Sequence, residues 1–230
     1  KPKAGTGSEP ISTMRRIGAM SSRIAALRIV LGDQLTTGLS ALQDADKAKD
    51  VIFMAEIARA GQNPNRHKKK IAFVFAAMRA FAHELRDAGW RVHYVRLDDP
   101  ANTGSLNNEI ARAVRKWRPA QLVTTEASSW RTLESQREWG QANDLPLSLL
   151  TDDRFLCSRA EFADWAKDRI SLRMEYFYRD MRRRTGLLMD GDSPEGGRWN
   201  FDSDNRKAAK ADLLMPQPLR FKPSAETAAV

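Results

Sequence analysis

The sequence is poor in cysteine: Cys157 is the single thiol among 230 residues. One thiol excludes a disulfide framework, and it excludes a zinc or iron–sulfur site whose thiolates all come from this chain. So few cysteines agree with a reducing compartment, and we expect a cytoplasmic protein. The three histidines, His67, His83 and His93, are scattered without the spacing of metal ligands. No metal site is therefore expected within this chain.

Long apolar runs are missing as well. A membrane helix needs about 18 or more consecutive apolar residues, and no window of the sequence approaches that length. We therefore expect no membrane partner. Residues 1–26 contain no hydrophobic segment of the kind found in secretory signals. Their small, polar and basic side chains predict a disordered basic tail.

Acidic residues are outnumbered, since 29 Asp and Glu stand against 38 Lys and Arg, a formal net charge of +9. This charge is compatible with a polyanionic partner, although it carries no information on the fold. The run "RHKKK", residues 66–70, lies at the start of the strongest helical pattern. Cations there oppose the helix dipole. The run therefore either serves an anion such as phosphate or is a solvated charge cluster.

Short apolar runs alternate with helical patterns between residues 27 and 167. Strands are predicted over residues 27–31, 51–57, 91–97, 121–126 and 147–150. Helices are predicted over residues 35–42, 68–88, 105–117, 132–143 and 158–167. This alternation is typical of βαβ units with right-handed crossovers. We therefore predict an α/β domain over residues 27–167, with a five-stranded parallel sheet and helices on both faces.

The alternation ends near residue 167. A helix is predicted over residues 172–185, and a long, polar, loop-rich stretch follows over residues 186–223. The apolar face of that helix would carry Met174, Phe177, Tyr178 and Met181. Such a face is usually part of a core, although stacking of nucleic-acid bases on Tyr176 or Tyr178 stays open. Residues 168–230 therefore read as a helix with a long irregular linker.

Candidate polar groups follow the first, second and fourth predicted strands. The motif "GDQL" places Gly32, Asp33 and Gln34 where open α/β sheets bind ligands, and a plain turn with Asp33 as a helix cap is the alternative. Glu56 and Glu126 end two other strands, where they would serve acid–base chemistry or be solvated. The glycine motifs of dinucleotide and nucleoside-triphosphate sites are absent after the first strand, which disfavours both enzyme classes.

Several segments resemble one known family, the deoxyribodipyrimidine photolyase-related proteins. The matching segments are "LGDQL", "HKKKIAF", "DRFL", "EFADWA" and "SLRMEYFYRDMRRRTGLLMDGDSPEGGRWNFDSDNR". The resemblance spans about residues 27–223 and is most specific over residues 174–206. It implies a Rossmann-like antenna domain, the N-terminal part of a light-dependent DNA repair flavoprotein similar to (6-4) photolyases. A blue-light sensory cryptochrome of the same family and a truncated non-catalytic domain are the alternatives.

The resemblance also implies the cofactors and partners. FAD and a four-iron four-sulfur cluster would belong to a C-terminal domain that is missing from this chain, and damaged DNA would bind through the full-length protein. The lyase chemistry would need that domain, so no catalytic residue is assigned within these 230 residues. Trp199 and Phe201 would face the missing domain. They should therefore be more exposed and mobile than Phe177 and Met181, which should pack on the α/β domain.

The antenna chromophore of the family is 6,7-dimethyl-8-ribityllumazine. By resemblance its contacts here would be Gly32, Asp33, Gln34, Ala55 and Val74, and the residues His67, Lys68, Lys69 and Lys70 match as well. The family usually has a glutamate where Ala60 stands, a tyrosine at Asn63 and a histidine at Arg66. Because that glutamate is a polar contact to the chromophore, we consider Glu56 as its substitute.

Overall fold

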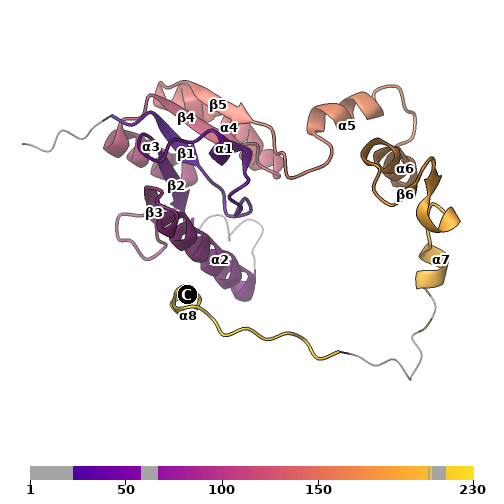
Figure 1. The fold of residues 1–230 in the computed structure, drawn as a ribbon. Helices are drawn as coiled ribbons and strands as arrows, with labels where there is room; N and C mark the ends of the chain where they lie inside the picture. The colour runs from indigo at the N-terminus through magenta and orange to yellow at the C-terminus, as the bar shows by residue number, and fades with distance from the viewer. Residues whose placement is uncertain (1–22, 58–66, 207, 209–215) are drawn as a thin grey trace, which may run out of the picture.

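The computed structural model describes residues 23–57, 67–206, 208 and 216–230 (Figure 1). Five strands form one parallel sheet in the order β3-β2-β1-β4-β5. The strands are β1 (Ala26–Ile29), β2 (Val51–Ala55), β3 (Val92–Val95), β4 (Gln121–Thr125) and β5 (Leu147–Leu150). The predicted five-stranded parallel sheet is confirmed. Most of the predicted disordered tail, residues 1–22, lies outside the described residues.

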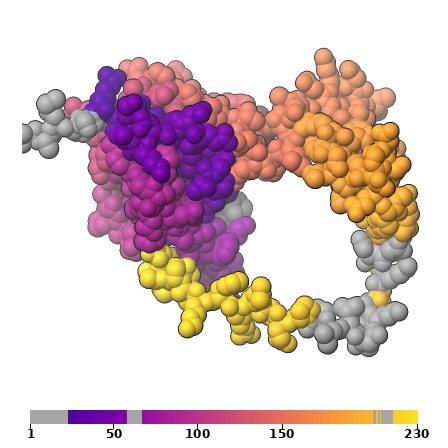
Figure 2. Space-filling model, viewed as in Figure 1, coloured from indigo at the N-terminus to yellow at the C-terminus, as the bar shows by residue number. Residues whose placement is uncertain are grey.

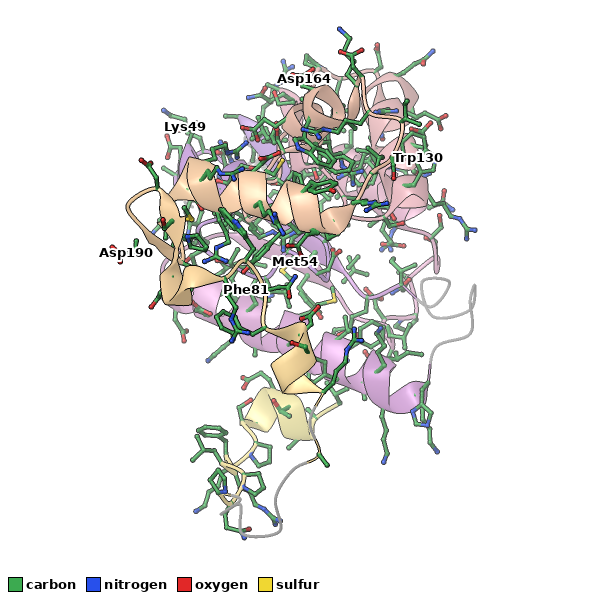
Figure 3. All side chains as sticks on the ribbon, turned by 90° about the vertical axis from the view of Figure 1, so that its right-hand side faces the viewer. Lys49, Met54, Phe81, Trp130, Asp164 and Asp190 are labelled. Atoms are coloured by element: carbon green, nitrogen blue, oxygen red, sulfur yellow. The ribbon has the colours of Figure 1, made fainter. Side chains whose placement is uncertain are left out.

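Helices cover both faces of this sheet, as predicted. They are α1 (Ser40–Gln43), α2 (Lys68–Asp87), α3 (Leu106–Trp117) and α4 (Trp130–Asn143). Successive side chains of a strand point to opposite faces. Accordingly, Ile52 and Met54 of β2 pack with α1 and α2, whereas Val51 and Phe53 pack with α3 and α4. Figure 3 labels Met54 and Phe81, which belong to the layer between β2 and α2.

Helix α1 is much shorter than predicted, because residues 35–39 are irregular, with a turn at residues 37 and 38. The backbone N–H of Leu39 donates to the carbonyl of Thr36 in this turn, and Gly38 lies within it. Threonine and glycine are poor helix formers, so the turn ends only where "SALQ" begins. Asp33 therefore caps no helix, and the alternative interpretation of "GDQL" as a capped helix start is wrong.

A buried ion pair joins the start of the sheet to α1. Arg28 of β1 and Asp50, which precedes β2, are 2.6 Å apart from Nε to Oδ2 and are both buried. The two Nη atoms of Arg28 donate to the carbonyls of Ala41 and Asp44. Asp50 also accepts the backbone N–H of Ala26. Each charge is thus hydrogen-bonded, which is the condition under which a protein tolerates buried charge.

Gly140 of α4 sits where the helix touches the chain that enters β5. A Cβ added there would lie 2.9 Å from the Leu147 Cβ and 3.0 Å from the Leu145 carbonyl oxygen. Because backbone cannot easily move away, we expect Gly140→Ala to lower the free energy of unfolding by about 1–3 kcal/mol. Urea denaturation measures this change. Gly38→Ala is the matched control, since its Cβ would meet only Thr36 Oγ1 at 3.9 Å; an equal loss in both variants would contradict the explanation.

Beyond the sheet, α5 (Arg159–Ala166) and α6 (Met174–Thr185) pack on each other. The ring of Phe177 meets those of Phe162 and Trp165 at 5.3 and 5.0 Å between centroids. The Trp165 indole N–H donates to Asp180, which adds a polar tie between the two helices. Figure 1 shows both helices set apart from the sheet. Phe177 thus packs on the predicted α/β domain of residues 27–167, but it does so through α5 at the end of that range and not through the sheet.

Trp199 follows a short hairpin, β6 (Met189–Asp190) with β7 (Ser193–Pro194), and a 3-10 turn, η2 (Glu195–Gly197). Its ring lies among three arginines of α6, 4.7 Å from the guanidinium of Arg183 and 5.4 Å from those of Arg179 and Arg182. Trp199 is half-buried, as Phe177 and Met181 are. Only Phe201, which is 37% exposed, shows the expected contrast in exposure.

The last described segment returns to the α/β part of the chain. After α7 (Asp202–Asn205), helix α8 (Ala225–Ala228) lies against α2, and Figures 1 and 2 show this return. Arg79 of α2 donates to the carbonyl of Ala229, and His83 lies 3.8 Å from the Glu226 carboxylate. The sequence predicted only a linker here, because four residues are too few for a helical pattern.

Candidate functional site

The carboxyl ends of β1 and β2 meet the first turns of α2 at the predicted ligand site. Gly32, just after β1, lies so close to α2 that an added Cβ would be 2.9 Å from Met78 Sδ and 3.3 Å from Val74 Cγ1. The structure therefore brings Gly32 and Val74 together. The close approach at Gly32 is made by a helix of this chain, which is a packing reason for glycine at this position.

Gln34 is fully buried and ties the end of β1 to the end of β4. Its Nε2 donates to the carbonyls of Thr125 and Glu126 at 3.2 and 3.0 Å, and its Oε1 accepts the backbone N–H of Leu31. Both ends of the amide are thus used within the chain. Asp33 is exposed, and its carbonyl accepts a hydrogen bond from Arg154. Asp33 is the polar side chain of "GDQL" that faces solvent.

Glu56 forms a buried polar cluster that the sequence did not predict. Both carboxylate oxygens accept from Arg79, at 2.6 and 2.9 Å, while the hydroxyl of Tyr94 and the backbone N–H of Leu97 add bonds of 2.7 and 2.8 Å. Burial alone would raise the pKa of Glu56, but the bonds from Arg79, Leu97 and Tyr94 outweigh it and hold the pKa below its ordinary value. Burial and the bond to Glu56 raise the pKa of Tyr94.

The other predicted contacts are spread over the two layers of the domain. Ala55 packs with the α3 and α4 layer, whereas Val74 packs with the α1 and α2 layer. Glu126 forms a separate ion pair with Arg159, with 3.7 Å between Oε2 and Nε. The predicted role of Glu56 and Glu126 as solvated strand ends is thus wrong for Glu56, which is buried and paired.

The basic run begins α2, as predicted. His67 is the N-cap residue, and its Nδ1 accepts the backbone N–H of Lys69 at 3.1 Å. Lys68, Lys69 and Lys70 are exposed. The positions at which the sequence departs from the family pattern, Ala60, Asn63 and Arg66, lie outside the described residues.

These residues differ in how well they fit a lumazine. Val74 offers an apolar surface and Asp33 a solvent-facing carboxylate, which suit a flat polar chromophore. Gln34 and Glu56 fit less well, because their polar atoms already have partners and would have to exchange one for the ligand. Lumazine contacts of these side chains stay predictions.

A second feature was not predicted: a large cleft between the β4–β5 side of the sheet and α6. Its cavity volume is about 1830 Å³. Side chains that line it include Trp130, Phe155, Leu156, Met174 and Tyr178, and all five are exposed. Trp130 is labelled in Figure 3. The cleft exceeds the usual size of small-molecule sites, and exposed apolar patches of this kind usually mark contact surfaces.

The sequence missed this cleft because it depends on where α5 and α6 lie relative to the sheet. The local sequence signal for it is the pair of adjacent apolar residues Phe155 and Leu156 in "DRFL", which the structure leaves exposed. Arg154, which precedes this pair, is fixed by Asp152, with 2.7 Å between Nη2 and Oδ2, and by the Asp33 carbonyl. That pairing connects the cleft to the "GDQL" turn.

Two comparisons with known proteins show what the chain is similar to. A family model described as deoxyribodipyrimidine photo-lyase-related protein matches residues 28–230. The chain is 46% identical over 200 residues to a protein of Agrobacterium fabrum named (6-4) photolyase. The match covers 87% of this chain and 39% of that relative, so the chain spans about two fifths of the relative's length. Among the described residues, no helix combines the length and apolarity needed to cross a membrane.

Proposed function

The chain belongs to the deoxyribodipyrimidine photolyase-related protein family, and we propose that it is the antenna-binding part of a light-dependent DNA repair flavoprotein, a (6-4) photolyase. The observation that carries this proposal is the 46% identity over 200 residues with a protein of that name. The proposed substrate of the whole protein is DNA that contains a (6-4) photoproduct. The sensory and truncated alternatives have no comparable support.

The proposed role of this chain is to hold the antenna. When bound, the lumazine would supply absorption of light whose energy passes to the flavin. Asp33 and Val74 would contact it at the carboxyl ends of the strands, where open α/β sheets bind ligands. Gly32 would keep α2 close to that site, since a side chain there would push Met78 away.

We propose that FAD and the four-iron four-sulfur cluster bind to a region equivalent to the part of the Agrobacterium fabrum relative that this chain does not match. Cys157 alone cannot supply the four thiolates of a cluster. We assign the cleft between the sheet and α6 to the interface with that part. Its exposed aromatic side chains support this assignment, since large apolar patches usually mark contact surfaces.

Repair by a chimera tests the proposal directly. This chain would replace the matched two fifths of the Agrobacterium fabrum protein, and the chimera would be given an oligonucleotide with a (6-4) photoproduct. We expect repair under blue light and none in the dark, measured by chromatography of the digested oligonucleotide. The unaltered relative and a chimera reconstituted without lumazine are the controls.

A folded chimera that binds FAD and lumazine yet repairs nothing would contradict the photolyase assignment and favour a sensory protein. A chimera that repairs equally well with and without lumazine, at limiting light, would contradict the antenna role alone. The absorption spectrum separates these outcomes because lumazine and flavin are both detected in it.

A further inference from the structure

A second, polar cleft lies along the open edge of the sheet. Strand β3 is at the end of the strand order and has a partner strand on one side only. The cleft has a volume of about 730 Å³, and its walls come from β3, from α3 and from the last turn of α2. The "GDQL" turn, in contrast, follows β1, which is the central strand of the sheet and is separated from β3 by β2.

Cations dominate the lining of this cleft. Arg86, Arg112, Arg115 and Lys116 stand against one carboxylate, that of Asp99. Arg112 already has partners within the chain, since it donates to Glu109 and to the carbonyl of Ala101. The Asp99 carboxylate also has a partner, because it accepts the backbone N–H of Ala101.

Arg86 and Arg115 differ from Arg112 in this respect. Within the part of the chain that the structure describes, neither Arg86 nor Arg115 makes an ion pair or a side-chain hydrogen bond, and both are exposed. Two guanidinium groups in the wall of one cleft give planar donors suited to an oxyanion.

His93 lies in the wall of the cleft, beside Lys116. Its Nδ1 accepts the indole N–H of Trp117 at 2.9 Å, and Lys116 Nζ is 3.3 Å from the same nitrogen. The pKa of His93 is lowered to about 4, chiefly by burial and in addition by the positive charges of Lys116 and Arg112, while Glu109 and Asp99 oppose the shift. At neutral pH His93 is therefore uncharged and adds no positive charge of its own to the cleft.

We propose that this cleft binds a small molecule that carries a phosphate group, held by the guanidinium groups of Arg86 and Arg115. Bidentate pairing of arginine with phosphate is the chemistry that these donors favour. The volume lies within the usual range of about 300–1,000 Å³ for small-ligand sites. We favour a small ligand over a nucleic-acid backbone because the cations line a concave site of that size. The proposal is independent of the antenna assignment.

Titration of the 230-residue chain with inorganic phosphate tests the proposal. The readout is the NMR signal of the Trp117 indole N–H, identified by its loss in Trp117→Phe. We expect a saturable shift of this signal. In the double variant Arg86→Ala, Arg115→Ala the affinity should fall about tenfold or more, as expected when charged hydrogen bonds are removed. Arg131→Ala, which removes an exposed arginine of α4 outside the lining of this cleft, should bind like the unaltered chain.

A second measurement separates binding from a general charge effect. Bound phosphate should raise the pKa of His93, because the anion offsets Lys116 and Arg112, and this rise should vanish in the double variant. Both replaced arginines are exposed, so amide spectra should confirm that the double variant is folded. Absence of saturation, or equal weakening by Arg131→Ala, would overturn the proposal. Binding of a short DNA duplex at this indole without saturable phosphate binding would overturn it in favour of a nucleic-acid contact.

Discussion

Replacing Asp50 with alanine is expected to lower the free energy of unfolding by about 3–5 kcal/mol. The change leaves the guanidinium of Arg28 buried without its counter-ion. It also removes the acceptor for the backbone N–H groups of Ala26 and Asp46, which Asp50 binds at 3.0 Å each. The loss should be large because the cost of an uncompensated buried charge adds to that of unpaired donors.

Chemical denaturation of the 230-residue chain measures the effect of Asp50→Ala. Asp98→Ala is the matched control, because Asp98 pairs with Arg96 in an exposed ion pair and should contribute little. The double variant Arg28→Met, Asp50→Ala should recover part of the loss, since it removes the unpaired charge. Equal stability of Asp50→Ala and Asp98→Ala would contradict this explanation.

Glu56→Ala is expected to lower the free energy of unfolding by a comparable amount, about 3–5 kcal/mol. It deprives Arg79, whose side chain is 12% exposed, of both carboxylate oxygens. It also leaves the Tyr94 hydroxyl and the Leu97 N–H without their acceptor. Denaturation midpoints of Glu56→Ala and of the unaltered chain give the difference. Glu84→Ala, at an exposed position on α2, is the control.

The contribution of Glu56 should depend on pH in a defined direction. Its pKa in the folded protein lies below the ordinary value, so the folded state binds its proton less readily than the unfolded state does. The stabilisation should therefore be complete above the unfolded pKa of about 4.3 and disappear as the pH falls through the folded pKa. A difference between Glu56→Gln and the unaltered chain that grows on acidification would contradict this assignment.

The same variant tests Glu56 as a chromophore contact. Glu56→Gln preserves the size of the side chain but cannot keep the charge that pairs with Arg79. If folded Glu56→Gln binds lumazine as the unaltered chain does, the role of Glu56 is structural, and Asp33 is left as the polar contact. Loss of lumazine binding in Glu56→Gln that is still folded would support the predicted substitution for the missing glutamate.

The sheet and its helices could be predicted because their signals are local. The apolar spacing of α2, for example, repeats every three to four residues, and the structure begins that helix at Lys68 as predicted. The role of Glu56 could not be predicted in this way. Its partners lie 23, 38 and 41 positions along the chain, and only the register of β2 with β3 and the packing of α2 bring them together.

For the candidate site as well, the position of the residues could be predicted from the sequence, but their availability for a ligand could not. The position of Gly32, Asp33 and Gln34 at a strand end follows from the sequence, because Gly32 interrupts an apolar run. Which of these side chains is free for a ligand depends on neighbours in three dimensions. Gln34 is occupied by β4, more than 90 positions away, while Asp33 remains exposed. Sequence resemblance alone does not distinguish the two.

The contact between α8 and α2 has a mechanical consequence. The helices α5 and α6 belong to a stretch of chain that leaves the sheet after β5 and contacts the α/β part again where α8 packs on α2. A segment tethered at both ends explores a smaller volume than one attached at a single end, so it spends more time near the surface that it faces. Changing the length of the tether should matter little, because closure entropy varies only by about 0.6 kcal/mol for each doubling of length. The second anchor point, rather than the length of the connection, would then decide how freely α5 and α6 move.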